Sequence, residues 1–544
     1  MQSPKNMKDK RIYNVFYNLH TVSSITIAVG LFICFFAGAF ALFKTNINRW
    51  EANVKKPEAI AIDYEKTLSV LDNEGYVLDG RNIFIGSGDD PKPYIMVLSQ
   101  PSKKKDSLST ANNRGALTQK ENELISLKLD PNTYKITDNK SIEQHGFLGT
   151  FIYELHYFEP IPKIGVYLSG ILAMFFFLSI IAGTIIHWKK IVPMFFSFRI
   201  KNSIKQLWSS GHTALGIIGL PFQLMYAITG AFFSLSIIVF IPTANVLFNG
   251  EQGGLMEYIA PSSKYENRIE EPLKNRENLN LIFKKAKDEL RVDDYRLSFV
   301  NITNFNYKNA RASFLFIEKQ EKSIFESAHI IYNVSDASIV EKKPFNKVTY
   351  QESVLYLLHV FHFGAFGGYF VKIIYFLLAM LTCFVIQSGV MLWLEARNNK
   401  KHLIKKKFNK SVVAIYTGIC MGLFPSFALL FCVAKIFPQN IENRFNIITG
   451  VFFIFWLVYT FYAYLSNNLK TITRNALIIA ALLGVFVPLL NGFQSGLWFW
   501  SSLDKGYKDS FFIDISWALF GLITFMGLIL TKKSKKNATT SLSA

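Results

Sequence analysis

Eight apolar segments of membrane-spanning length dominate this chain. A helix of about twenty apolar residues crosses the hydrocarbon layer of a bilayer. The eight segments lie at residues 23–43, 163–188, 212–241, 359–394, 411–436, 446–465, 476–493 and 511–530, the last four within 411–531. Hydrophobic residues make up 50% of the sequence, and 51 of the 544 residues are Phe. The sequence therefore predicts a polytopic α-helical membrane protein with about eight transmembrane helices.

Basic residues gather in the connectors on one side of these helices. Lys and Arg cluster in 1–22, 189–211, 395–410 and 532–544. Such clusters mark the cytoplasmic face of a membrane protein. We therefore expect both termini in the cytoplasm and the two long insertions, 44–162 and 242–358, on the opposite side. The formal net charge of +20 then reflects topology and contact with membrane lipid, and it gives no support for nucleic-acid binding.

The two insertions have the composition of small folded domains. Short strand-like runs such as Tyr94–Leu98 and Ser313–Glu318 alternate with turn-rich breaks, and Asn278–Leu290 has the pattern of a helix. Each insertion also has a similar strand–turn phrase, at 127–136 and at 330–339. We expect each insertion to form a small α+β domain.

Four histidines occupy matching places in two copies of one sequence pattern. His20 and His212 each begin a long apolar segment, and each is followed eighteen residues later by Gly-Ala-Phe. His156 and His359 each follow a leucine and precede a glycine nine residues on. The pattern predicts an internal parallel repeat, in which one helix–domain–helix unit occurs twice.

The predicted topology places these histidines in two level pairs. His20 and His212 would lie at the cytoplasmic ends of the first and third helices, and His156 and His359 at the outer ends of the second and fourth. Two imidazoles on opposite faces of a porphyrin form a low-spin haem, and neutral imidazole is tolerated at membrane depth. We therefore expect one or two bis-histidine haem b groups per chain, with these four residues as axial ligands of the haem iron.

Two further histidines lie near these positions. His362 is three residues after His359 on the same helical face, so it is an alternative ligand or a neighbour of the ligand. His187 adjoins Trp188 and is more typical of an anchor at the membrane interface. Histidines at helix ends also occur as ordinary packing residues, and this interpretation stays open. Because the chain has no Cys-x-x-Cys-His motif, any haem is expected to be held non-covalently.

One stretch around His359 resembles a known family. Leu358–Gly368 (LHVFHFGAFGG), followed by Gln387–Trp393 (QSGVMLW), resembles the signature of the PepSY-associated transmembrane proteins of the bacterial inner membrane. The phrases Asn18–His20 and Glu154–His156 are similar to two further elements of that family. The resemblance covers about residues 15–395. It implies that the insertions are periplasmic PepSY-like domains and that the helix histidines bind haem.

Members of this family include siderophore reductases, and the resemblance implies a function of that class. The protein would be an oxidoreductase that takes electrons from quinol or a cytoplasmic reductase and carries them across the inner membrane. It would reduce ferric iron, delivered as a ferric siderophore, in the periplasm, and the Fe(II) would pass to iron-transport partners. Reduction releases the metal because such chelators hold hard Fe(III) far better than Fe(II). No catalytic side chain beyond the haem ligands is expected.

Two functions of other classes stay open. In the main alternative, a membrane-anchored, non-redox PepSY module binds or inhibits a periplasmic protein or peptide. In a third interpretation the four C-terminal helices form a transport path, although their predicted mid-membrane stretches carry no charged residue. The sequence by itself indicates no role for these four helices.

Overall fold

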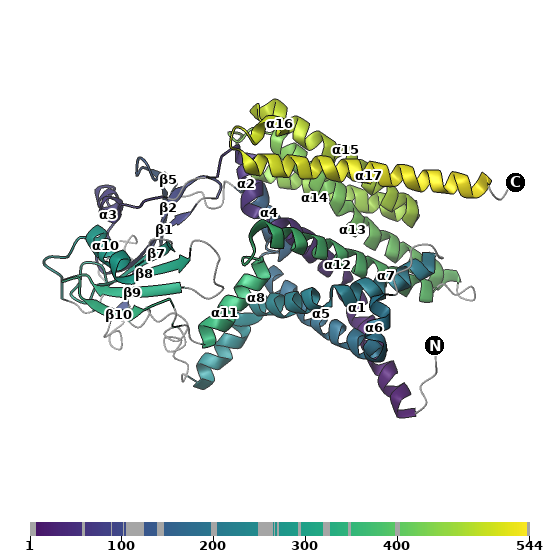
Figure 1. Cartoon of the computed structure of the whole chain (residues 1–544), viewed down its shortest axis with the longest axis horizontal. Helices are drawn as coiled ribbons and strands as arrows, with labels where there is room; N and C mark the ends of the chain where they lie inside the picture. Colours follow the sequence, from purple (N-terminus) through teal and green to yellow (C-terminus); the bar gives the residue numbers. More distant parts are fainter. Residues whose placement is uncertain are drawn as a thin grey trace, which may run out of the picture.

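The computed structural model shows a bundle of membrane-length helices with a β-sheet at one end (Figure 1). It describes the chain except for residues 1–6, 57–59, 89, 102, 105–123, 139–145, 197–203, 248–264, 266, 269–270, 292–294, 319–326, 346, 348–349, 398–402 and 541–544. We call the end of the helical part that faces the sheet the sheet side, and the opposite end the far side.

Among the described residues, seven helices are long and apolar enough to span a membrane, and a bent pair makes an eighth. The seven are α1 (Met7–Ala41), α5 (Gly165–His187), α12 (Gly368–Ala396), α13 (Leu403–Ile436), α14 (Arg444–Ser466), α15 (Leu469–Ser495) and α17 (Lys508–Thr540). The bent pair is α7 (Ile204–Ile218) and α8 (Leu220–Leu247), which meet at 68°. Pro221 explains the bend, because its ring and its missing N–H interrupt the helical ladder. The prediction of a multi-pass helical membrane protein is confirmed.

The long helices form two packed groups. In the first group α1 packs against α5 and α12, while α8 packs against α5 and α7 against α12. In the second group α13 packs against α14 and α15, and α15 packs against α17. Phe36 of α1 joins the groups, because its ring centroid lies 4.7 Å from that of Phe424 and 4.9 Å from that of Phe427, both on α13.

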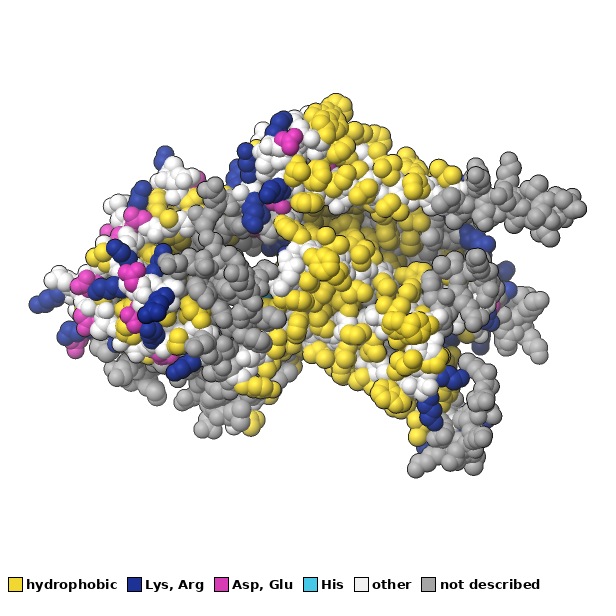
Figure 2. Space-filling view, in the orientation of Figure 1, with side chains coloured by type: hydrophobic (Ala, Val, Ile, Leu, Met, Phe, Trp, Pro, Cys, Tyr) yellow, Lys and Arg dark blue, Asp and Glu magenta, His cyan; other side chains and the backbone are white. Residues whose placement is uncertain are grey.

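The surface of the molecule divides in the same way as its fold. Figure 2 shows hydrophobic side chains over the helical part, whereas Lys, Arg, Asp and Glu gather over the sheet. Helix α1 begins and α17 ends on the far side (Figure 1). The described ends of the chain therefore lie on the same side of the apolar belt.

Short helices connect the bundle to the sheet and to itself. Three of them lie on the sheet side: α2 (Lys44–Ala52), α4 (Leu148–His156) and α11 (Tyr350–Phe363). Helix α4 packs against both α1 and α2, and α11 packs against α8. The remaining short elements of the helical part are η2 (Trp188–Lys190), α6 (Ile191–Phe195) and α16 (Phe499–Ser502).

Strands from both insertions form one antiparallel sheet in the order β10-β9-β8-β7-β1-β2-β4-β5. The first insertion supplies β1 (Arg81–Gly88), β2 (Tyr94–Pro101), β4 (Ile125–Leu129) and β5 (Ile136–Asp138). The second supplies β7 (Tyr295–Thr303), β8 (Arg311–Glu318), β9 (Ser327–Asn333) and β10 (Ile339–Lys343). Strands β1 and β7 join the halves, with Ile83 opposite Ile302 and Ile85 opposite Val300. The two insertions, expected as separate α+β domains, therefore share one sheet.

Each half of the sheet is preceded by a helix that covers its buried face. These helices are α3 (Tyr64–Asn73) and α10 (Leu279–Leu290), and their apolar residues join the strands in one hydrophobic core. The predicted helix at Asn278–Leu290 is confirmed as α10, with the Asn278 side chain accepting the first free backbone N–H groups. The predicted runs Tyr94–Leu98 and Ser313–Glu318 lie in β2 and β8. A short parallel pair, β3 (Lys103–Lys104) with β6 (Asn267–Arg268), also links the insertions.

An ion pair fastens the two halves to each other on the helix-covered face. Both carboxylate oxygens of Glu65 accept N–H groups of Arg276 at 2.6 Å, and Oε1 also accepts the backbone N–H of Leu279 at 2.7 Å. Burial tends to raise the pKa of Glu65, but the hydrogen bonds from Arg276 and Leu279 outweigh it and hold that pKa below its usual value. The carboxylate of Glu65 thus links α3 to the start of α10.

We predict that Glu65→Gln weakens the junction of the two halves by about 1–2 kcal/mol at pH 7, because it removes a charge-assisted, bidentate contact. A carboxylate with a lowered folded-state pKa stabilises the fold above its unfolded pKa, about 4.3, and this stabilisation is lost as the pH falls through the folded-state value. The variant should therefore lose stability at pH 7 and differ little from the wild type near pH 3. Denaturant unfolding in detergent at both pH values measures this.

The matched control is Glu271→Gln, which breaks the exposed pair with Lys308. Exposed pairs contribute about 0–1 kcal/mol, so this variant should unfold close to the wild type. Equal losses of stability in the two variants would contradict the role given to Glu65.

Candidate functional site

The structure brings the candidate histidines together as two pairs. His20 of α1 and His212 of α7 have ring centroids 6.0 Å apart. His156 of α4 and His362 of α11 have ring centroids 6.1 Å apart. We call the first the far-side pair and the second the sheet-side pair. Each pair joins one histidine from each of the two predicted repeat copies.

Backbone carbonyl groups fix the rings of the far-side pair. Nδ1 of His20 donates to the carbonyl oxygen of Ser179 at 2.9 Å, and Nδ1 of His212 donates to that of Val385 at 2.9 Å. A carbonyl oxygen only accepts hydrogen bonds, so Nδ1 carries the proton in both rings and Nε2 keeps its lone pair. Both imidazoles are therefore held as the tautomer that binds a metal through Nε2.

The sheet-side pair is held in the same tautomer. Nδ1 of His156 donates to the carbonyl oxygen of Cys34 at 2.6 Å. Nδ1 of His362 lies 2.8 Å from the hydroxyl of Thr229, which itself donates to the carbonyl oxygen of Met225 at 2.8 Å. Because the only proton of that hydroxyl is already donated to Met225, the hydroxyl can only accept from His362, and Nδ1 of the imidazole is the donor. In the neutral imidazole, Nε2 is therefore the unprotonated nitrogen in all four rings.

The three hydrogen bonds from an imidazole to a backbone carbonyl share one sequence feature. A glycine stands four residues after the residue whose carbonyl accepts. The glycines are Gly38, Gly183 and Gly389, which follow Cys34, Ser179 and Val385. In an α-helix the residue at i+4 covers the carbonyl of residue i. A Cβ on the three glycines would lie only 2.7, 3.1 and 3.0 Å from the nearest imidazole atom. The missing side chain therefore leaves the carbonyl open to a second donor, the imidazole.

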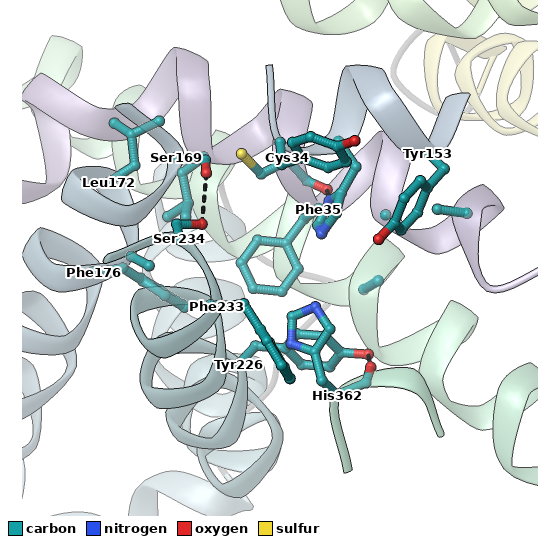
Figure 3. Close-up of a pocket in the computed structure, with 18 of the residues that line it drawn as sticks. Cys34, Phe35, Tyr153, Ser169, Leu172, Phe176, Tyr226, Phe233, Ser234 and His362 are labelled. Atoms are coloured by element: carbon teal, nitrogen blue, oxygen red, sulfur yellow. Dashed lines mark hydrogen bonds between the residues drawn. The ribbon is translucent and has the colours of Figure 1, made fainter. Parts of the chain in front are cut away.

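A cavity of about 440 Å³ lies beside the sheet-side pair. Its wall is mostly apolar, and it includes the two histidines of the pair, His359, Gly38 and Gly230. Cofactor sites are typically cavities of roughly 300–1,000 Å³ with apolar walls and a few placed polar groups. Figure 3 shows the ring of His362 in this cavity, where its centroid lies 5.1 Å from those of Tyr226 and Phe233. Tyr226 also donates from its hydroxyl to the carbonyl oxygen of His362 at 2.9 Å.

The geometry favours His362 over His359 as the partner of His156, which corrects the preference derived from sequence. His359 lines the same cavity, but its ring packs against Phe363, with centroids 4.6 Å apart. The sequence repeat matched His359 with His156 because each lies nine residues before the glycine that begins the next long helix, α12 or α5. Helix α4, however, ends at His156, whereas α11 continues a full turn beyond His359 to Phe363. His156 is thus the last residue of α4 and His362 the last but one of α11, so both lie at the end of their helices.

The structure also places the other residues that the sequence singled out. His187, the last residue of α5, interacts electrostatically with both His20 and His212, so it lies near the far-side pair. A Cβ at Gly364 or Gly367, which follow His362 closely in the sequence, would meet Val371 or Tyr375 of α12 rather than a histidine ring.

Sequence reasoning missed the roles of Gly183, Gly389 and Thr229. The available signal was a glycine near the end of each apolar span, five residues before Trp188 in one and four before Trp393 in the other. Isolated glycines in helices often mark close approach of another group. Nothing in the sequence indicated which histidine would approach.

Comparison with known proteins agrees with this architecture. Residues 17–396 match the family described as the PepSY-associated TM region, so the chain belongs to this family. The matched region holds both histidine pairs and the sheet, whereas α13 to α17 lie outside it. No curated protein matches the chain.

We predict that Gly38→Ala destabilises the helical part by about 1–3 kcal/mol, because the new methyl group would overlap the His156 ring. Gly216→Ala is the matched control, since its nearest neighbour would lie at 3.8 Å, an ordinary contact. The control should be neutral or slightly stabilising, as Gly→Ala in helices usually is. Thermal unfolding in detergent measures both. A Gly38→Ala variant as stable as the control would refute the close approach.

Proposed function

We propose that this protein is a membrane electron carrier that binds haem b between the imidazoles of each histidine pair. In this proposal it reduces ferric iron, delivered as a ferric siderophore, on the sheet side. The sheet side is the periplasm, the far side with both termini is the cytoplasm, and the bilayer is the bacterial inner membrane. The internal parallel repeat and the assignment of both insertions as PepSY-like domains are parts of the same proposal.

The separation of the rings is the observation that carries the proposal. Two imidazoles that bind one metal ion from opposite sides, each with a metal–nitrogen distance of about 2 Å, have ring centroids roughly 6 Å apart. The two pairs have centroid separations of 6.0 and 6.1 Å. Two different pairs of helices, α1 with α7 and α4 with α11, therefore hold imidazoles at the spacing that axial ligation requires. The residues fit the cofactor.

The chain's own groups prepare these imidazoles for ligation. The bonds at Nδ1 fix each ring and leave Nε2 as the ligating nitrogen. Gly38 and Gly230 keep the cavity wall beside the sheet-side pair free of side-chain bulk. The apolar surroundings favour neutral imidazole and exclude water. Bound haem would supply one-electron redox chemistry at both depths.

The arrangement of the pairs suits transfer across a bilayer. His20 and Cys34, the residue that holds His156, are fourteen residues apart on α1, or about 21 Å along the helix axis. Aromatic rings occupy part of the interior between the two depths. The ring centroid of Phe35 lies 5.5 Å from that of Phe176 and 6.4 Å from that of Phe222. An electron donor on the far side, such as quinol or a cytoplasmic reductase, would supply the chain, and iron-transport partners would take up the Fe(II).

Visible spectra of the detergent-purified protein test this function. We predict a low-spin, reducible spectrum with about two haems per chain by pyridine haemochrome, in keeping with two bis-histidine sites. His362→Ala and His156→Ala should each remove one haem, and His20→Ala the other. His359→Ala is the control and should keep both. The reduced protein should be reoxidised by a ferric hydroxamate chelate.

Two results would overturn parts of the proposal. Loss of haem from His359→Ala but not from His362→Ala would reverse the sheet-side assignment. A protein that stays colourless after haem is supplied would exclude the redox function. That result would favour the non-redox alternative, in which the sheet binds or inhibits a periplasmic protein or peptide.

A further inference from the structure

A polar helix lies buried at the junction of the two helical groups. Helix α2 follows α1 directly, and its residues from Asn46 to Glu51 are all buried although most of them are polar. Burial of polar and charged groups is costly unless each finds a partner. The partners of α2 therefore indicate what this helix does.

Side chains of the C-terminal helices bind one end of α2. Nζ of Lys435 donates to the carbonyl oxygen of Trp50 at 2.6 Å and to Oδ1 of Asn53 at 2.8 Å. The indole N–H of Trp50 donates to Asp514 of α17 at 2.8 Å. A cation at the end of α2 also complements the negative end of the helix dipole.

Arg444 of α14 provides the firmest of these contacts. Its Nη1 donates to Oε1 of Glu51 at 2.6 Å. Its other nitrogens donate to the carbonyl oxygens of Phe437 at 2.8 Å and Ala434 at 2.5 Å, which end α13. The two hydrogen bonds within the C-terminal helices therefore fix the orientation of the guanidinium group that binds Glu51. This makes Glu51 a rigid point on α2.

Glu51 in turn holds the first turn of α4. Its other oxygen, Oε2, accepts the backbone N–H of Leu148 at 2.6 Å. One turn earlier on α2, Asn48 accepts the N–H of Thr150 at 3.2 Å. Phe147, the residue before α4, has no side-chain acceptor with which to cap the helix. The N-terminus of α4 is thus capped by two side chains of another helix.

Helix α4 depends on this support and carries His156 at its end. It has 9 residues, and a helix this short is not stable without tertiary contacts. Its face packs on α14 as well, because the ring of Phe151 lies 5.4 Å from that of Phe452. Nothing but about 12 Å of continuous helix separates Leu148 from His156. Displacing the first turn of α4 would displace the imidazole.

We propose that the Arg444–Glu51 ion pair positions α4 and thereby sets the His156 imidazole in the sheet-side pair. Arg444 and Glu51 are positioning residues, and the C-terminal helices act on the sheet-side site without touching it. This gives α13 to α17, which lie outside the family match, a function in tuning one of the two sites. The inference about haem at that site rests on the proposed function, whereas the positioning of α4 does not.

The test uses the full-length protein with both partners neutralised, Glu51→Gln with Arg444→Gln, so that no unpaired buried charge remains. Hydrogen exchange is measured first on the protein before haem is added. Amides of residues 148–151 should exchange at least about tenfold faster than in the wild type, while those of α5 and α12 stay unchanged. Haem release is then measured in a His212→Ala background that keeps only the sheet-side site. It should be about 10–100-fold faster, the usual effect of losing a group that orients a ligand.

Two further variants keep the test sharp. Tyr462→Phe removes a half-buried hydrogen bond, 2.7 Å long, that Asn475 donates to Tyr462 inside the C-terminal bundle, without touching α2. It should leave both the exchange at 148–151 and the haem release unchanged. If the double variant fails to fold, Asn48→Ala leaves the ion pair in place and removes the two hydrogen bonds between Asn48 and Thr150, together with one to Asp90. It should raise the same exchange rates by a smaller factor.

The outcomes separate this inference from the proposed function. Unchanged exchange at 148–151 in the double variant and in Asn48→Ala overturns the positioning role, even if two haems bind. Faster exchange with unchanged haem release and spectrum overturns the link from α4 to His156. A wild-type protein without haem overturns the electron-transfer function, while faster local exchange would still support the positioning of α4.

Discussion

The contacts of the buried imidazoles with helix backbones organise the structure. An imidazole inside an apolar bundle needs an acceptor for its N–H, and the helix interior offers only carbonyl groups that are already bonded. Glycine four residues on makes such a carbonyl accessible, and α1, α5 and α12 each use this device once, at Gly38, Gly183 and Gly389. The fourth ring, of His362, uses the Thr229 hydroxyl instead. Because these bonds tie histidines of one helix to the backbone of another, they also fix which helices are neighbours.

The two helical groups have different parts in this arrangement. The group of α1, α5, α7, α8 and α12 carries or contacts all four paired histidines and coincides with the family match. The C-terminal group meets the first group through Phe36 of α1 and supports the sheet-side site through α2 and α4. Its charged residues Lys435, Arg444 and Asp514 are buried against α2, together with Glu51. The C-terminal group contributes no histidine to either pair. Its role in the proposal is to support α4, the short helix that carries His156.

Much of the fold followed from local sequence patterns. Apolar length predicted the spans, strand-like runs predicted β2 and β8, and the helical pattern at Asn278–Leu290 predicted α10. The pairing of His20 with His212 also followed, because both stand at the start of an apolar segment, at the same distance from a shared Gly-Ala-Phe. The choice between His359 and His362 did not follow. It depends on how far α11 extends before it breaks, and His359 and His362 share the same local pattern. The single sheet was missed as well, since a β1–β7 pairing between insertions leaves no mark on either strand.

The sequence by itself determined that this chain crosses a membrane several times, that its insertions combine helix and strand, and that histidines recur at two depths. These features depend on composition and short-range periodicity, which each segment carries within itself. Only the tertiary structure decided which imidazoles stand 6.0 and 6.1 Å apart, which carbonyls hold them and what Arg444 and Glu51 do for α4. These depend on contacts between residues hundreds of positions apart, where direction and distance are set by helix packing and by the need to satisfy every buried polar group.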